Sequence, residues 1–131
     1  MNANKILLVE DDEMMLRIVK TALSREGFNV DVSKNGKDAL AQLEASGFGY
    51  DLLITDIMLP FMTGFELIDK VRSNSAGQKM AVIVVSSLNN EDSILQGFHL
   101  GADDYVKKPI IASELIIRVK KLLFPKKRIE V

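Results

Sequence analysis

Five short apolar segments without helical periodicity recur along the chain and predict the strands of a buried sheet. Three of them, at 6–9, 52–54 and 80–85, are nearly continuous apolar runs, the pattern of strands covered on both faces of a parallel sheet. The other two, at 28–33 and 103–108, are more polar and favour edge positions. The pattern therefore predicts three central strands and two edge strands.

The stretches between these strands carry apolar residues at helical spacing and predict five helices. Their expected inward positions are Met15, Ile18, Val19, Ala22 and Leu23; Ala39, Leu40 and Leu43; Phe65, Leu67, Ile68 and Val71; Ile94, Leu95 and Phe98; and Leu115, Ile116, Val119, Leu122 and Leu123. The residues that mark helix ends are Gly27, Gly36, Thr63 with Glu66, Asn89, Gly101 and Pro125. For the fourth helix a second interpretation stays open, because its three apolar residues could instead form an exposed patch for a partner.

Strands and helices that alternate in this way are typical of a right-handed, doubly wound parallel sheet. We predict an α/β fold of the flavodoxin-like kind, with strand order 2-1-3-4-5 and five flanking helices. A length of 131 residues fits one domain. We place this domain at residues 1–124 and interpret 125–131 as a basic tail or the start of a linker.

Composition narrows the class of protein. The chain has no cysteine, which excludes disulfides and thiolate chemistry, and no apolar run of the roughly 18 residues that a membrane span needs. Seventeen basic residues stand against eighteen acidic ones, which argues against a nucleic-acid-binding domain. We therefore expect a cytoplasmic protein that contacts neither membrane nor nucleic acid.

Polar residues follow the predicted strands at the points where the strands end. Glu10 and Asp11 follow the first strand, Asp56 the third, and Ser86 with Ser87 the fourth. Neighbouring strands lie about 4.8 Å apart, so the carboxylates of Asp11 and Asp56 are expected within roughly 5–6 Å of each other. At that range two carboxylates repel by about 3 kcal/mol at an effective dielectric near 20, so a cation is required. Oxygen ligands without His or Cys favour Mg²⁺ or Mn²⁺.

Asp56 is the candidate reactive group, since a carboxylate next to a divalent ion can attack phosphorus and form an acyl phosphate. A lysine after the fifth strand, together with the metal ion, would offset charge on the transferred oxygens, and the Ser86 hydroxyl could donate to one of them. Composition alone leaves Lys107 and Lys108 as rivals for the lysine.

The ordered set of motifs resembles the receiver domain of bacterial two-component response regulators over about residues 5–123. The resemblance rests on Val-Glu-Asp-Asp at 9–12, on Asp56 with Met58, Pro60 and Gly64, on Ser86, and on Gly-Ala-Asp-Asp-Tyr-Val-Lys-Lys-Pro at 101–109. Ser86 follows Asp56 by 30 residues and Lys108 follows Ser86 by 22, which is similar to the family's spacing.

The resemblance implies a role for each metal-site residue. Asp56 would be the phosphoacceptor and a Mg²⁺ ligand, Asp11 a second direct ligand, and Glu10 a ligand through water. The backbone carbonyl of Met58 would be a further ligand.

It also implies the residues around the phosphoryl group. Lys108 would bind a phosphoryl oxygen, next to a cis bond to Pro109, and Ser86 and Tyr105 would form a switch pair. Ser87, in a loop that contacts the phosphoryl group, stands where alanine is usual and could crowd access.

The implied partner is a sensor histidine kinase or a phosphotransfer protein, and the implied output surface is the fourth helix, fifth strand and fifth helix. A phosphorylation-dependent homodimer stays open: Asp104, Glu114 and Arg118 match charges that the winged-helix class uses, but Ile94 replaces a basic partner. Such a domain is not a metabolic enzyme; it catalyses only its own phosphorylation and slow dephosphorylation at Asp56.

Three alternatives remain. The first is an interaction module on the same fold that works without phosphorylation. A phosphatase of the haloacid-dehalogenase type would need a second acid where Met58 stands. A flavodoxin-like electron carrier would need a hydroxyl- and amide-rich phosphate loop where the acidic residues 10–12 stand.

Overall fold

The structure, a computed structural model, describes residues 4–125. These residues form one parallel sheet of five strands in the order β2-β1-β3-β4-β5, which confirms the predicted fold class. The strands are β1 (Lys5–Val9), β2 (Asn29–Ser33), β3 (Leu52–Thr55), β4 (Ala81–Ser86) and β5 (Asp104–Lys107). The two polar strands lie at the edges, as predicted from their composition.

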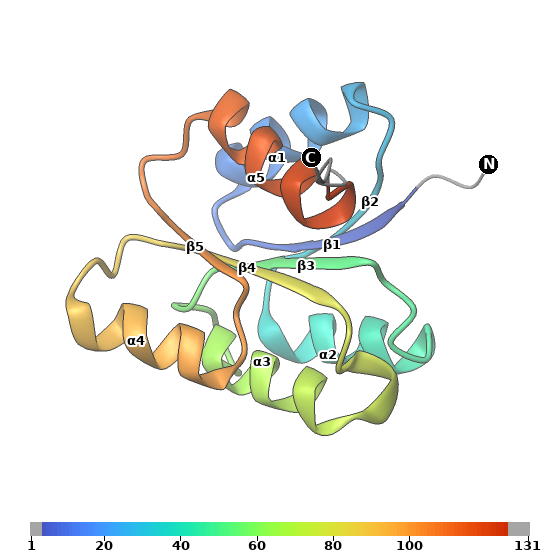
Figure 1. Cartoon of the computed structure of the whole chain (residues 1–131), viewed down its shortest axis with the longest axis vertical. Helices are drawn as coiled ribbons and strands as arrows, with labels where there is room; N and C mark the ends of the chain where they lie inside the picture. Colours follow the sequence, from blue (N-terminus) through green and yellow to red (C-terminus); the bar gives the residue numbers. More distant parts are fainter. Residues whose placement is uncertain (1–3, 126–131) are drawn as a thin grey trace, which may run out of the picture.

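The helices cover the two faces of the sheet unequally (Figure 1). The helices α1 (Glu13–Arg25) and α5 (Ala112–Leu123) lie on one face, and α2 (Gly36–Ala45), α3 (Gly64–Ser73) and α4 (Glu91–Leu100) lie on the other. A 3₁₀ turn at Ser75–Gly77, which was not predicted, leads from α3 towards β4.

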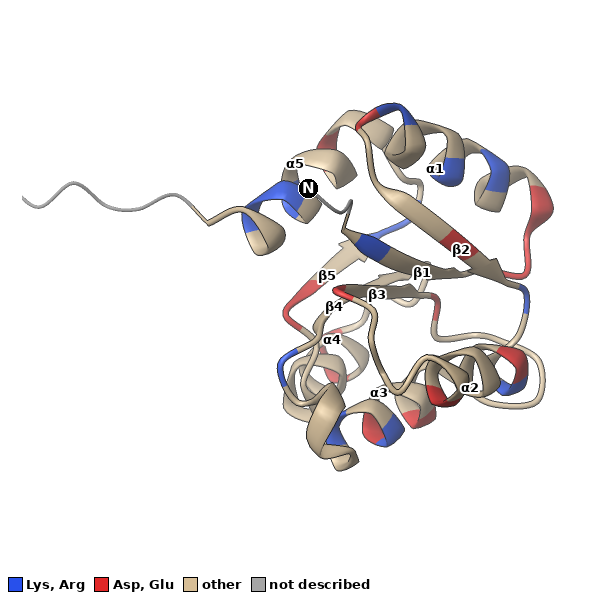
Figure 2. Cartoon of the chain, turned by 90° about the vertical axis from the view of Figure 1, so that its right-hand side faces the viewer, with Lys and Arg blue, Asp and Glu red and all other residues tan. Residues whose placement is uncertain are grey.

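Two apolar layers result, because successive residues of a strand point to opposite faces. In β1, Ile6 and Leu8 belong to the layer beneath α1 and α5, whereas Leu7 and Val9 belong to the layer beneath the other three helices. Charged residues lie mainly on the helices and the connecting loops, and the strands are largely uncharged (Figure 2).

The predicted helix ends are confirmed with two shifts of one residue, and the first of them is that Gly36, predicted to precede α2, is the first residue of that helix. Thr63 caps α3 by accepting a hydrogen bond from the backbone N–H of Glu66 at 3.2 Å. Gly27 and Gly101 adopt φ angles of 92° and 117°, the left-handed conformation that glycine tolerates. The cap of α4 is Asn90 and not Asn89, since the Asn90 side chain accepts from Ser93 N at 2.8 Å.

Two helix faces differ from the predicted stripes. In α1, Ile18 is 52% exposed, and Leu16, which the apolar spacing did not single out, is buried in its place. In α4, Leu95 and Phe98 are exposed, which fits the second interpretation of this helix, whereas Ile94 packs against the core as an inward residue. Residue 125 is the last that the structure describes, so the rest of the predicted tail lies outside the described residues.

No helix among residues 4–125 is both long enough and apolar enough to cross a membrane.

Candidate functional site

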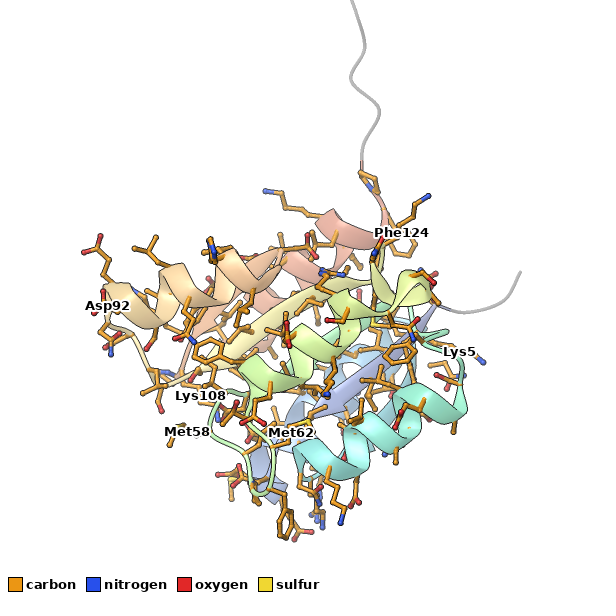
Figure 3. All side chains as sticks on the ribbon, turned by 90° about the horizontal axis from the view of Figure 1, so that it is seen from below. Lys5, Met58, Met62, Asp92, Lys108 and Phe124 are labelled. Atoms are coloured by element: carbon orange, nitrogen blue, oxygen red, sulfur yellow. The ribbon has the colours of Figure 1, made fainter. Side chains whose placement is uncertain are left out.

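The strand register brings the predicted polar residues together at the carboxyl ends of the strands. Val9 of β1 pairs with Thr55 of β3, so Glu10 and Asp56, the next residue of each chain segment, emerge side by side. Lys107 of β5 pairs with Ser86 of β4, and Lys108 follows directly. Met58 and Lys108 lie at the carboxyl ends of the strands, and Lys5 lies at the opposite end of the sheet (Figure 3).

Three carboxylates converge there. Each of Glu10, Asp11 and Asp56 offers an oxygen that lies within 4.8 Å of the other two. Glu10 and Asp56 are buried, while Asp11 is exposed. Burial raises the pKa of Glu10, the nearby Asp56 charge adds to this rise, and the hydrogen bond with Lys108 opposes it. Three oxygen donors of like charge at this spacing fit a hard divalent cation such as Mg²⁺.

Lys108 is the lysine of this pocket. Its Nζ atom lies 2.6 Å from Glu10 Oε1 and 2.7 Å from Asp56 Oδ2. Burial alone would lower the pKa of Lys108, but the hydrogen bonds to Asp56 and Glu10 raise it above its usual value. Lys107 is exposed, so the structure separates the two lysines that composition left as rivals. The peptide bond to Pro109 is cis.

The loop after β3 holds the second oxygen of Asp56. Asp56 Oδ1 accepts hydrogen bonds from the backbone N–H groups of Ile57 at 2.6 Å and Met58 at 3.3 Å. The Met58 side chain is exposed, and Phe61 further along has a φ of 71°. Thr55, which is fully buried, donates its hydroxyl to the Asp56 carbonyl at 2.8 Å. Nothing in the apolar pattern of β3 had pointed to Thr55.

Ser86 and Tyr105 meet through the segment that follows β4. The buried Ser86 Oγ accepts from Leu88 N at 3.1 Å, and the Tyr105 hydroxyl donates to the Leu88 carbonyl. Burial raises the pKa of Tyr105, Ser86 lowers it through a hydrogen bond, and the Asp56 charge raises it. Tyr105 is buried and belongs to the apolar layer beneath α2, α3 and α4. Ser87 is exposed beyond the strand end.

Asp12 lies outside the group formed by Glu10, Asp11 and Asp56 and has a structural role in α1. Its side chain accepts from Met15 N at 3.0 Å and so caps α1.

A doubly wound sheet with an acidic, lysine-containing pocket at the carboxyl ends of its central strands defines the class of protein. The chain belongs to the response regulator receiver domain family, whose model matches residues 6–120.

Two curated relatives illustrate the similarity. The transcriptional regulatory protein PcoR of Escherichia coli is 39% identical over 119 residues, which cover 91% of this chain and 51% of that protein. The transcriptional regulatory protein ResD of Bacillus subtilis is 37% identical over 123 residues, 93% of this chain and 49% of that protein. The chain thus spans about half the length of these relatives.

Solved structures give the same result for the fold. The chemotaxis response regulator CheY4 of Vibrio cholerae superimposes with a TM-score of 0.86 at 25% identity, covering 92% of this chain and 99% of that one. The receiver domain of the Francisella response regulator 1452 gives a TM-score of 0.83 at 32% identity, with 91% and 95% covered. Phosphorylation-based signal transduction is the function of this family, and histidine kinases or phosphotransfer proteins phosphorylate its receiver domains.

Proposed function

We propose that Asp56 is the phosphoacceptor of this receiver domain. The observation that carries the proposal is the environment of its carboxylate, which is buried, held by two backbone amides through one oxygen, and paired with Lys108 through the other. A fixed, ionised carboxylate needs no general base in order to act as a nucleophile.

We propose that the acidic cluster holds Mg²⁺, with Asp11 and Asp56 as direct ligands, Glu10 through water, and the Met58 carbonyl as a further ligand. Three oxygens within 4.8 Å of one another support the carboxylate part of this set. When bound, Mg²⁺ supplies positive charge beside the phosphoryl oxygens. The Met58 carbonyl belongs to the loop whose amides hold Asp56, so both ligands depend on one backbone segment.

In the proposed reaction, an Asp56 oxygen forms a bond to phosphorus while the bond from phosphorus to the donor's imidazole nitrogen breaks, and that nitrogen keeps the electron pair. Lys108 moves from the carboxylates of Glu10 and Asp56 to a phosphoryl oxygen. Ser86 exchanges its hydrogen bond from Leu88 N for one to the phosphoryl group, and Ser87 borders the entrance. The domain thereby catalyses its own phosphorylation. In the slow dephosphorylation that we propose, a water oxygen forms a bond to phosphorus while the bond from phosphorus to the Asp56 oxygen breaks; Asp56 keeps the electron pair and the phosphate is released with the water proton. Both reactions are proposed to take place in the cytoplasm.

Phosphorylation is proposed to act on the surface formed by α4, β5 and α5 through Ser86 and Tyr105. Both side chains hydrogen-bond to the backbone of Leu88, the second residue after β4, so a change at Ser86 reaches the segment that leads into α4. Leu95 and Phe98 supply exposed apolar surface on α4.

We propose a sensor histidine kinase or phosphotransfer protein as the donor. Residues 1–124 are proposed as the receiver domain and 125–131 as a tail or the start of a linker. Because PcoR and ResD are about twice as long and are named transcriptional regulators, an attached effector is the natural recipient of the signal.

A phosphorylation-dependent homodimer would have to free Arg118, which pairs with Asp104 at 2.9 Å and Glu114 at 3.1 Å in the same chain.

The test is incubation with acetyl phosphate and Mg²⁺, followed by intact-mass measurement. We expect a gain of one phosphoryl group that Asp56→Asn abolishes and that Asp69→Asn, an exposed aspartate of α3, leaves unchanged. Chelation of the divalent ion should also abolish the gain. Phosphorylation that persists in Asp56→Asn at the original rate would refute the assignment.

A further inference from the structure

The loop between β3 and α3 contains Asp56 and Met58, and close backbone packing holds the end of this loop that leads into α3. Gly64 N donates to the Ile57 carbonyl at 2.9 Å and closes the loop. A methyl group on Gly64 would lie 2.1 Å from the Asp56 carbonyl oxygen, so this end of the loop has no room for a side chain. The loop therefore has one firm anchor directly behind Asp56.

A second anchor lies outside the site, at the first residue of α2. Gly36 N donates to the Pro60 carbonyl at 3.4 Å, in the middle of the loop. A methyl group on Gly36 would lie 2.2 Å from the Met62 carbonyl oxygen and 2.7 Å from Met62 Cβ. Neither of these atoms can swing away as the end of a flexible side chain could, so the backbone would have to move.

Helix formation does not explain the glycine at this position. The cap of α2 is Asn35, whose side chain accepts from Asp38 N at 2.7 Å, and a glycine at the first helical position is not needed for that bond. Glycine also lowers helix stability relative to alanine. What the structure uses at Gly36 is the space that a missing side chain leaves for the Pro60–Met62 part of the loop.

We propose that Gly36 is a positioning residue for the phosphorylation site. Because Gly36 has no side chain, the Pro60–Met62 part of the loop packs directly on its α-carbon. This packing fixes the Met58 carbonyl and the backbone amides of Ile57 and Met58, which orient the Asp56 carboxylate. This inference rests on the proposed function of Asp56 and extends it to a residue of α2 that touches neither metal nor phosphoryl group.

The experiment compares Gly36→Ala with Gly77→Ala. Gly77 is a matched control because a methyl group there would lie 2.3 Å from the Val71 carbonyl oxygen, an equally severe backbone clash in the turn before β4. Three quantities are measured for the unmodified protein and both variants: the backbone amide resonances of residues 56–64 other than Pro60 without metal, the Mg²⁺ dissociation constant, and the rate of phosphorylation by acetyl phosphate.

For Gly36→Ala we expect shifted amide resonances at Ile57 and Met58, and a Mg²⁺ affinity and a phosphorylation rate that are each lower by about tenfold, as displacements below 1 Å suffice to produce. Gly77→Ala should lose thermal stability but keep these amide resonances and remain within about twofold in Mg²⁺ affinity. Equal Mg²⁺ affinities in the unmodified protein and Gly36→Ala, or equal losses in both variants, would overturn the proposal.

If Gly36→Ala does not fold, the Gly36 amide resonance of the unmodified protein decides, because Gly36 N donates to the Pro60 carbonyl in the middle of the loop. A shift of this resonance on Mg²⁺ binding supports the role of Gly36 in positioning the loop, and an unchanged resonance rejects it. Failure of the proposed function is separate: if the unmodified protein binds Mg²⁺ but Asp56 is never phosphorylated, the amide resonances and the Mg²⁺ affinity still test Gly36.

Discussion

Lys108 contacts two carboxylates before any phosphoryl group is present. Among the described residues, the cluster combines the carboxylates of Glu10, Asp11 and Asp56 with this one ammonium group, so two negative charges remain. One divalent cation would neutralise them. We therefore expect Lys108 to have opposite effects on the two proposed activities: it would compete with the metal ion before phosphorylation and would assist the metal ion once the phosphoryl group arrives.

We predict that Lys108→Ala binds Mg²⁺ more tightly than the unmodified protein does and is phosphorylated more slowly. Removing one positive charge a few ångströms from the metal position should raise the affinity on the order of tenfold at low salt, after screening by solvent. Calorimetric Mg²⁺ titration and acetyl phosphate kinetics measure the two effects. Lys107→Ala is the matched control, since Lys107 is the exposed neighbour. A fall in both quantities for Lys108→Ala would contradict this account of the charge.

Tyr50 gives a prediction for alkaline pH. Burial, followed by the hydrogen bond that its hydroxyl donates to Asp31 Oδ2 at 2.6 Å, raises the pKa of Tyr50 to about 12 from its usual 10. The folded state therefore holds the proton more tightly than the unfolded state does. The resulting stabilisation is complete below pH 10 and is lost as the pH rises towards 12.

The comparison of the unmodified protein with Tyr50→Phe tests this directly. The unmodified protein should be the more stable at pH 8, and its advantage in the free energy of unfolding should shrink through the window from 10 to 12. Urea unfolding at a series of pH values measures the difference. An advantage that stays constant or grows across the window would show that Tyr50 does not hold its proton in this way.

Residue spacing was sufficient to place Glu10, Asp56 and Ser86 together, because the end of each buried strand can be located from its apolar run. It did not separate Lys107 from Lys108, since β5 is polar and its end is poorly marked, and only the resemblance favoured Lys108. The Leu88 carbonyl, which accepts from Tyr105, is a backbone group without any sequence pattern.

At the scale of the helices, the errors of the sequence analysis lie where two neighbouring residues could take the same role. Asn89 and Asn90 are both capping residues, and the backbone after β4 selects Asn90. Ile18 and Leu16 are both apolar, but only Leu16 faces the sheet. Apolar spacing finds a helix, and the strand it packs on decides which apolar residues are buried.

In the described structure, the last helix, α5, begins without a side-chain cap. Ile111 stands at its N-cap position, makes no side-chain capping hydrogen bond because its side chain is apolar, and is 60% exposed. We predict that Ile111→Ser raises the free energy of unfolding by about 1 kcal/mol, because the hydroxyl can accept from a free backbone N–H of the first turn.

Urea unfolding measures this effect, and Ile117→Ser is its control, since Ile117 is equally exposed within α5 and gains no cap. If both serine variants change stability by the same amount, then the loss of exposed apolar surface, and not capping, is the cause.

At the scale of the whole molecule, one arginine joins segments that are distant in the sequence. Arg72, in the last turn of α3, donates from Nη2 to the Gly101 carbonyl at 2.7 Å and from Nη1 to the Gly77 and Met80 carbonyls at 2.9 Å and 2.5 Å. It also lies 3.2 Å from Asp103 Oδ2. The end of α4, the turn before β4 and the entrance to β5 are thus tied to α3. No periodic pattern predicts such a link, because its acceptors are mostly backbone carbonyls.

We predict that Arg72→Lys lowers the free energy of unfolding by about 2 kcal/mol, although the charge is kept. A single ammonium group cannot reach carbonyls on two sides as the planar guanidinium does, and the partly buried carbonyls that it leaves lose their donors. The amides of Gly101 and Ala102, which close the end of α4, should also exchange with solvent faster.

Urea unfolding and amide hydrogen exchange measure the two effects, with Arg25→Lys at the exposed end of α1 as the control for the same chemical change. A local role for Arg72 would appear as faster exchange at Gly101 and Ala102 with unchanged global stability. That result would separate the end of α4 from the rest of the fold. If global stability falls and exchange at Gly101 and Ala102 also becomes faster, then α3, α4 and the sheet unfold as one unit. In that case the C-terminal end of α4 is fixed by Arg72, and a displacement of its N-terminal end, which follows Leu88, is opposed by that fixed end.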